Sequence, residues 1–362
     1  MMAMQQVTVV ARIATAVVLS VCASCEKAHD RQAPGPTPVP TKDARVAADD
    51  ARAPKHDARD EGPEPTVPPP PPTVKAHGKG DCKIEYAPRP TRDPNPVCKI
   101  AGGSFMMGSA DPKAAANEKP VRKVTLTPYF IDQFEVTNAQ IAHFLNAVGN
   151  QCEKAHGCLF SAVHDDGLQS GAVIRNVAGH YEVDRGHERR PTRSATVEGA
   201  ERYCAWVGKR LPTEAEWEFA ARHDPKTQRD YRWPWGDKFL PKRAACDESI
   251  CKDGFEFDFE VENTSNQAPV GTFDGTHGFG DGSSPWGVHD MAGNVSEIMA
   301  DTTSYSAPYS DCGTCVDPVL LKTGENTYHV TRGSSGAISL DSSITFRTGR
   351  TRVIEGFRCI YR

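Results

Sequence analysis

The first quarter of this 362-residue chain is most notable for the residues that it lacks. No aromatic residue occurs between Pro34 and Pro72, although 12 of the 28 prolines of the chain lie there. A segment with so few large apolar side chains cannot bury enough surface to offset the entropy lost on ordering. We therefore expect residues 25–92 to form a disordered, proline-rich tether, and residues 93–362 to form the folded domain.

The chain also lacks a stripe of basic residues and a long apolar run. Its 42 Lys and Arg are scattered among 47 Asp and Glu, for a net charge of -5. This charge pattern predicts that nucleic acid is not a partner. The apolar stretch Ile13–Val21 is too short for a membrane-spanning helix, but with Arg12 before it the stretch is typical of a secretion signal.

Two cysteines follow this apolar stretch and resemble a bacterial lipoprotein cleavage site. Ser24 gives Cys25 the small preceding residue that a signal peptidase prefers, whereas Leu19 supplies the apolar position three residues before Cys22. We predict a signal peptide over 1–24 and a lipid on Cys25, with Cys22 as the alternative and a plain cleaved signal peptide as the competing interpretation. A lipid anchor would place the domain in the bacterial cell envelope, on the periplasmic or outer-surface side of a membrane.

With Cys25 lipidated, ten of the remaining cysteines are expected to pair in an oxidising compartment. Close spacing suggests three disulfides, Cys82 with Cys98, Cys152 with Cys158 and Cys246 with Cys251. Cys312 and Cys315 have the spacing of a redox or zinc pair, but no second pair of that spacing follows to complete a zinc site. We interpret them as part of a small structural loop, bridged internally or to other cysteines.

Periodicity and capping signals predict three helices and few long strands. The first helix begins at the capping box Thr137–Gln140 and stops at Gly149, the second runs from Thr196 to Gly208, and the third begins at Thr213. Strands are predicted at Ile100–Ser109 and Val121–Phe130. The stretch Gln151–Arg190 is expected to be a long irregular insert, and the residues after Arg222 are expected to form short strands and long loops.

Seven separated motifs, in this order, resemble those of the formylglycine-generating, or sulfatase-modifying factor, domain. They are Ala101–Gly108, Pro128–Asn138, Ala200–Arg222, Trp233–Gly236, Pro269–Gly271, Trp286–Glu297 and Gly356–Cys359. The resemblance implies an α+β fold of the C-type-lectin-like kind, low in regular secondary structure. Members of the family include copper enzymes that oxidise a cysteine of sulfatases to formylglycine, and also proteins with other or no known chemistry, so the fold does not settle the function.

The copper-binding cysteines of that family are missing from this chain. The resemblance places them at Ile338 and Ser343, and no cysteine lies between Cys315 and Cys359. Copper(I) prefers soft thiolate ligands, which neither replacement provides. We expect no copper site and no catalytic residue at these positions, although Cys312 with Cys315 is conceivable as a displaced pair.

The resemblance also assigns structural and ligand-binding residues. It implies a disulfide between Cys204 and Cys359. It implies calcium at Asn294, Val295 and Glu297, because hard oxygen ligands suit that ion. A second calcium loop, near Cys246, stays open because relatives carry Asn there.

Relatives have arginines near the C-terminus that support a substrate groove. On that basis Ser335, Arg347 and Arg350 are groove candidates here, whereas Arg358 is expected to pair with a buried carboxylate. Surface solvation explains the exposed arginines equally well.

Taken together, these features favour a membrane-tethered accessory or binding module for an unidentified protein, peptide or glycan. The alternatives are a divergent oxidase or other enzyme that modifies an exported protein, and a structural component of the envelope.

Overall fold

The computed structural model describes residues 75–76, 78–152, 158, 173–193, 195–245, 267–304, 312, 315–324, 327–333, 347–349 and 355–362. All of them belong to one compact unit, which extends from Glu61 to Arg362. None of the helices in these ranges has the length and apolar character needed to cross a membrane. The residues of the predicted signal peptide, the cysteines Cys22 and Cys25, and the predicted pair Cys246 and Cys251 lie outside the described residues.

The α+β class is confirmed, and its largest sheet joins the two ends of the described domain. This antiparallel sheet has the order β1-β2-β5-β13, with Ile131 opposite both Cys98 and Ile360. Its strands are β1 (Cys82–Lys83), β2 (Val97–Ile100), β5 (Tyr129–Asp132) and β13 (Ile360–Tyr361). The C-terminal strand β13 therefore lies next to β5.

Three predicted helices are confirmed at α1 (Asn138–Val148), α2 (Val197–Trp206) and α3 (Glu214–Arg222). A threonine side chain caps each one. Thr137 and Thr213 form capping boxes, and the Thr196 side chain accepts a hydrogen bond from Gly199. These local signals explain why the helix starts could be read from the sequence.

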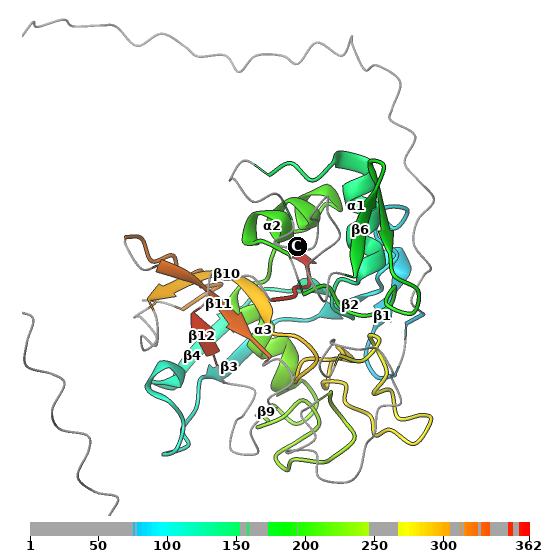
Figure 1. Cartoon of the computed structure of the whole chain (residues 1–362). Coiled ribbons are helices and arrows are strands. Elements are labelled where there is room, and N and C mark those ends of the chain that lie inside the picture. The colour runs from blue at the N-terminus through cyan, green and yellow to red at the C-terminus, as the bar shows by residue number, and fades with distance from the viewer. Residues whose placement is uncertain are drawn as a thin grey trace, which may run out of the picture. The chain divides into compact units, whose positions relative to one another are not determined.

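The remaining strands form small sheets, most of which contact α3. They are β3 (Gly103–Met107) with β4 (Arg122–Leu126), β6 (Ile174–Val177) with β7 (His180–Val183), β8 (His223–Asp224) with β9 (Arg229–Asp230), and β10 (Glu297–Ser304), β11 (Thr327–Arg332) and β12 (Arg347–Gly349). Short 3-10 helices occupy Ile84–Tyr86 and Ala116–Glu118. Helix α3 contacts β3, β4, β10 and β11, so it lies between two of these sheets (Figure 1).

Two expectations for the strands need correction. The stretch Gln151–Arg190 contains the hairpin β6–β7, whose turn residues Ala178 and Gly179 both have positive φ. Positive φ at both residues suits a tight two-residue hairpin turn. Such turns are usually recognised in a sequence by Asn-Gly or Asp-Gly, so the Ala at the first position hid this turn. The strand expected over Val121–Phe130 is two strands, because β4 and β5 belong to different sheets.

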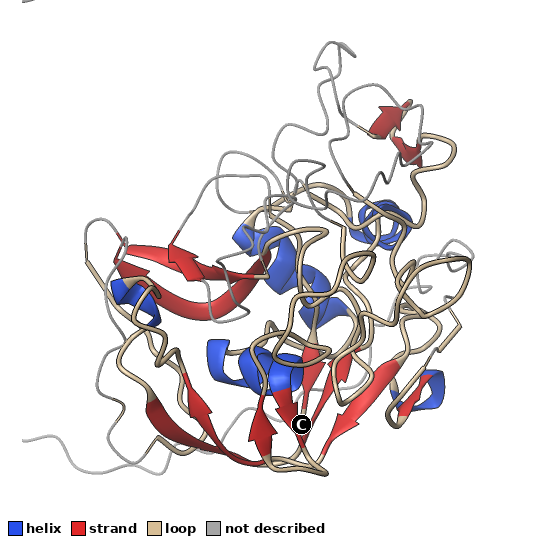
Figure 2. Cartoon of the chain, turned by 90° about the horizontal axis from the view of Figure 1, so that it is seen from below, coloured by secondary structure: helices blue, strands red, loops and turns tan. Residues whose placement is uncertain are grey.

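The core consists of two large apolar clusters. One gathers around Trp217 and Phe219 of α3 and the strands that the helix covers. The other packs α1 and α2 against Phe357 and Cys359. Figure 2 shows the helices lying against the strands, with loops forming much of the remaining chain.

Disulfides join all eight cysteines in the described ranges. The pairs are Cys82–Cys98, Cys152–Cys158, Cys204–Cys359 and Cys312–Cys315. The third joins α2 to the segment just before β13 across 155 positions of sequence. The fourth settles the open question about Cys312 and Cys315, which pair with each other.

Candidate functional site

The groove predicted from the family lies largely outside the described residues. Ser335, Ile338, Ser343 and Arg350 are all outside those ranges, and of Arg347 only its backbone place in β12 is described. Their roles as emptied copper positions and as groove residues therefore stay predictions.

The loop predicted to bind calcium is buried and makes several contacts with the protein. Asn294 has a φ of 60°, accepts a hydrogen bond from Ala268 N at 2.9 Å and donates one to Glu135 Oε2 at 2.7 Å. The Val295 N–H donates to the other oxygen of Glu135 at 3.2 Å. The loop is thus fixed by Glu135, a contact that the sequence motif did not reveal.

Glu297 pairs with Arg358, as expected for that arginine. Arg358 Nε lies 2.7 Å from Glu297 Oε2, and its Nη2 lies 2.8 Å from Oε1. Both side chains are fully buried. Glu297, one of the predicted calcium ligands, therefore already has a positively charged partner.

Glu135 and Asp290 add further negative charge to this buried cluster. Burial and the charges of Asp290 and Glu297 raise the pKa of Glu135 well above its usual range. Burial also raises the pKa of Asp290 to about 6, despite the hydrogen bond from Gly271 N. Three carboxyl groups, those of Glu135, Asp290 and Glu297, thus interact electrostatically with one arginine, Arg358.

The same region gives no independent metal signal. In the described part of the chain, no three His, Cys, Asp or Glu side chains are arranged to hold a metal ion. Calcium at Asn294, Val295 and Glu297 stays a prediction. One-to-one binding in a calorimetric titration of calcium into chelator-treated protein would establish it, and the absence of heat would refute it.

A second buried ion cluster connects the start of the domain to α2. Lys209 Nζ donates to Asp93 Oδ2 at 2.6 Å and also contacts Asp132 of β5. Burial alone would lower the pKa of Lys209, but the charges of Asp132 and Asp93 raise it above its ordinary value. Lys209 stays protonated, and the cluster holds three separate segments together.

The raised pKa of Asp301 in β10 predicts how the stability of the domain depends on pH. Burial and the charge of Glu214 raise the pKa of Asp301 to about 7, although Leu320 N and Glu214 N donate hydrogen bonds to it. A folded-state pKa above the unfolded value of about 3.9 means that the folded state holds the proton more tightly. Asp301 therefore makes its full contribution to the free energy of unfolding below about pH 4, and this contribution is lost as the pH rises towards 7.

We therefore expect the melting temperature to fall as pH rises from 5 to 7.5. Asp301→Asn removes the titrating group, so the fall should be smaller in this variant when both proteins are followed by circular dichroism. The buried Asp290 contributes in the same direction and leaves a residual slope. A variant whose pH profile matches that of the wild type would contradict the assignment to Asp301.

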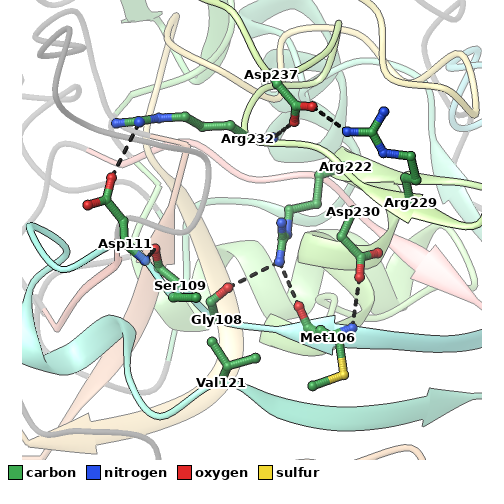
Figure 3. Close-up of a pocket in the computed structure, with 11 residues that line it drawn as sticks. Met106, Gly108, Ser109, Asp111, Val121, Arg222, Arg229, Asp230, Arg232 and Asp237 are labelled. Atoms are coloured by element: carbon green, nitrogen blue, oxygen red, sulfur yellow. Dashed lines mark hydrogen bonds and ion pairs between the residues drawn. The ribbon is translucent and has the colours of Figure 1, made fainter.

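A surface pocket with a volume of about 430 Å³ lies beside the outer edge of β3 (Figure 3). Its position is set by β3, the end of α3, the hairpin β8–β9 and the loop that follows this hairpin. The pocket is lined by Met106, Gly108, Ser109, Ala110, Asp111, Val121, Arg222, Arg229, Asp230, Arg232 and Asp237. Charged side chains of both signs dominate this lining.

The floor of the pocket is held by Arg222 and Asp230. Arg222 donates to Gly108 O at 3.1 Å, to Tyr231 O at 2.9 Å and to Glu218 Oε1 at 3.0 Å. Asp230 Oδ2 accepts from Met106 N at 2.9 Å. Arg222 also donates to Met106 O, so both backbone groups of Met106 in β3 are occupied by side chains and a further strand could not pair at this residue.

Asp230 is ionised in this arrangement. Burial alone would raise the pKa of Asp230, but the hydrogen bonds from His223 and Met106 N and the charge of Arg222 lower it below its usual value. The floor therefore carries a fixed positive and a fixed negative group.

The rim of the pocket carries two further ion pairs, on opposite sides in Figure 3. Arg229 Nη2 lies 2.7 Å from Asp237 Oδ2, with the two side chains 64% and 49% exposed. Arg232 Nη1 lies 3.3 Å from Asp111 Oδ2, with exposures of 37% and 32%. The motif Trp233–Gly236 lies between these residues in sequence, but the motif alone did not predict a charged pocket.

Comparison with known proteins agrees with this architecture. The solved structure of PvdO from Pseudomonas aeruginosa superposes with a TM-score of 0.52 over 79% of this chain and 99% of that one. At 21% sequence identity this likeness defines the fold class and no more. The described α+β domain is thus of the same structural class.

The family follows from the sequence comparisons. The family model for the sulfatase-modifying factor enzyme 1-like domain matches residues 84–362, and the chain belongs to this family. A formylglycine-generating enzyme of Thermomonospora curvata is 33% identical over 274 residues, which are 68% of this chain and 85% of that protein. The inactive Cα-formylglycine-generating enzyme 2 of Bos taurus is 30% identical over 292 residues, covering 73% and 87% respectively.

Proposed function

We propose that this protein is a binding or accessory module, tethered to a membrane of the bacterial cell envelope, that has lost the copper oxidase chemistry of its family. Its ligand is an exported protein, a peptide or a glycan. The observation that carries the proposal is the state of the cysteines. All eight described cysteines are in disulfides, so none of them offers the thiolate that copper(I) needs.

The sequence left open that Cys312 and Cys315 form a displaced copper-binding pair. Their disulfide weighs against this alternative. A disulfide sulfur has no negative charge and is a poor ligand for copper(I). The family positions themselves hold Ile338 and Ser343. A relative described as inactive, from Bos taurus, further supports a family member without the oxidation step.

The rival proposal is a divergent enzyme that modifies an exported protein. It is favoured by the 33% identity to a formylglycine-generating enzyme, which is similar to the identity to the inactive relative. This rival predicts turnover of a cysteine-containing sulfatase peptide.

The test loads the oxidised full chain with copper(I) and follows oxygen consumption with such a peptide. We expect neither tight copper binding nor oxygen uptake above the buffer rate. The matched variant Ile338→Cys/Ser343→Cys restores both thiols, and we expect it to bind copper(I) at least 100-fold more tightly than the parent. Oxygen uptake by the parent that depends on peptide and copper would overturn the proposal.

The membrane anchor has its own test. Metabolic labelling with a radioactive fatty acid should mark the wild-type protein and fail to mark Cys25→Ser. Labelling that is lost only in Cys22→Ser would move the lipid to the alternative cysteine, and no labelling of the wild type would remove the anchor.

A further inference from the structure

The pocket beside β3 has a balanced set of charges. Its lining holds three arginines and three aspartates. Arg222 and Asp230 are committed to the backbone of β3 and to its neighbours, as described above. The rim pairs, Arg229 with Asp237 and Arg232 with Asp111, are more exposed than the floor residues, so a ligand can reach them.

The two rim pairs can be opened at low cost. Each is an exposed or half-exposed ion pair, and such pairs typically contribute about 0–1 kcal/mol. Each rim carboxylate is also fixed independently of its arginine. Asp111 Oδ1 accepts from Lys113 N at 2.9 Å, and Asp237 Oδ1 accepts from Arg232 N at 3.2 Å. The aspartates therefore stay in place when a ligand draws the arginine side chains away.

The balance of charge indicates a ligand that carries both signs. An anion that binds one arginine would leave an aspartate without its partner, and a cation would have the opposite effect. A zwitterion can satisfy an arginine with its carboxylate, through a forked contact, and an aspartate with its ammonium group. Neither charge of the pocket is then left uncompensated.

The pocket also offers apolar surface of suitable extent. Met106 is 46% exposed although it lies in a strand, and Ala110 and Val121 complete the apolar part of the lining. The volume of about 430 Å³ is within the range of about 300–1,000 Å³ found for small-molecule sites. An apolar side chain between two charged ends would cover this surface.

We propose that this pocket binds a short peptide with free amino and carboxyl ends. The carboxylate contacts Arg229 or Arg232, the ammonium group contacts Asp111 or Asp237, and an apolar side chain lies over Met106. This inference deepens the binding role proposed above and rests on it. Peptide binding and copper loading are measured in separate experiments, so either can fail while the other stands.

The test is a calorimetric titration of the full chain with the dipeptide Leu-Leu. N-acetyl-Leu-Leu, which lacks the ammonium group, and Leu-Leu amide, which lacks the carboxylate, serve as matched probes. We expect saturable binding of the free dipeptide and at least a tenfold loss of affinity for each blocked form. If N-acetyl-Leu-Leu bound as tightly as Leu-Leu, the pocket would recognise only the carboxylate and the proposal would be overturned. The absence of Leu-Leu binding would also overturn it.

Two variants locate the binding in this pocket. The double variants Arg229→Gln/Arg232→Gln and Asp111→Asn/Asp237→Asn, which remove both candidate groups of one sign, should each weaken Leu-Leu binding at least tenfold. Arg175→Gln, which removes another exposed arginine paired with Asp184 on the hairpin β6–β7, should leave the affinity unchanged. Melting temperatures of all three variants report whether they fold. Folded double variants of the rim that bind like the wild type would place the ligand elsewhere and contradict the proposal.

Discussion

Replacing Arg358 with Met should destabilise the domain by about 3–5 kcal/mol, the range measured when one partner of a buried ion pair is removed. Arg358 is fully buried and makes a forked contact with Glu297. Although burial lowers its pKa, the charges of Glu297, Glu135 and Asp290 raise the pKa of Arg358 overall. Without the guanidinium group, these three carboxyl groups would lie in the core with no arginine among them.

The size of this loss should depend on pH. In Arg358→Met the pKa values of Glu135 and Asp290, which burial already raises, rise further, so the folded state must take up protons. The destabilisation should therefore be larger at pH 8 than at pH 5, when urea unfolding is compared at the two values. This dependence separates an electrostatic cause from a simple packing defect.

Two further variants control the experiment. Arg175→Met removes an arginine that is 61% exposed and whose partner Asp184 is 35% exposed, so we expect a loss of at most about 1 kcal/mol. The double variant Arg358→Met/Glu297→Met removes both charges and should recover part of the stability. A loss in Arg358→Met no larger than that in Arg175→Met would contradict the assigned role.

The sequence predicted those parts of the fold that local chemistry determines. Helix starts follow from threonine caps, and α1 ends at Gly149, whose φ of 78° suits a residue without a side chain. Ordered motifs predicted the fold class and the role of Arg358. These features depend on residues that are close in sequence or that belong to one motif.

The sequence could not predict features that depend on distant residues. Lys209 meets Asp93 across 116 positions of sequence, and Glu135 fixes the loop at Asn294 across 159 positions. The pocket likewise joins Asp111 to Arg232 through the packing of β3 beside α3 and β9. Charged residues in loops usually indicate solvated surface, so only the fold shows which of them line a common pocket.

The disulfide between Cys204 and Cys359 should provide the largest single covalent contribution to stability. It closes a loop of 155 positions, and the chain-entropy relation gives about 5 kcal/mol for a loop of that length. Its effect acts mainly through the unfolded chain, which loses conformations when its distant parts are joined. Cys204→Ala/Cys359→Ala should therefore reduce the free energy of unfolding in urea by about this amount.

The pair Cys152–Cys158 offers a matched control within the same chain. Its separation is only 6 positions, for which the same relation gives about 2 kcal/mol. Replacing both of its cysteines with Ala introduces the same chemical change with a much smaller effect on the unfolded chain. Equal losses in the two double variants would show that loop length does not determine the stabilisation. A loss at least twice as large for the long loop would instead identify Cys204–Cys359 as the crosslink that holds α2 and the C-terminal strand in one cooperative unit.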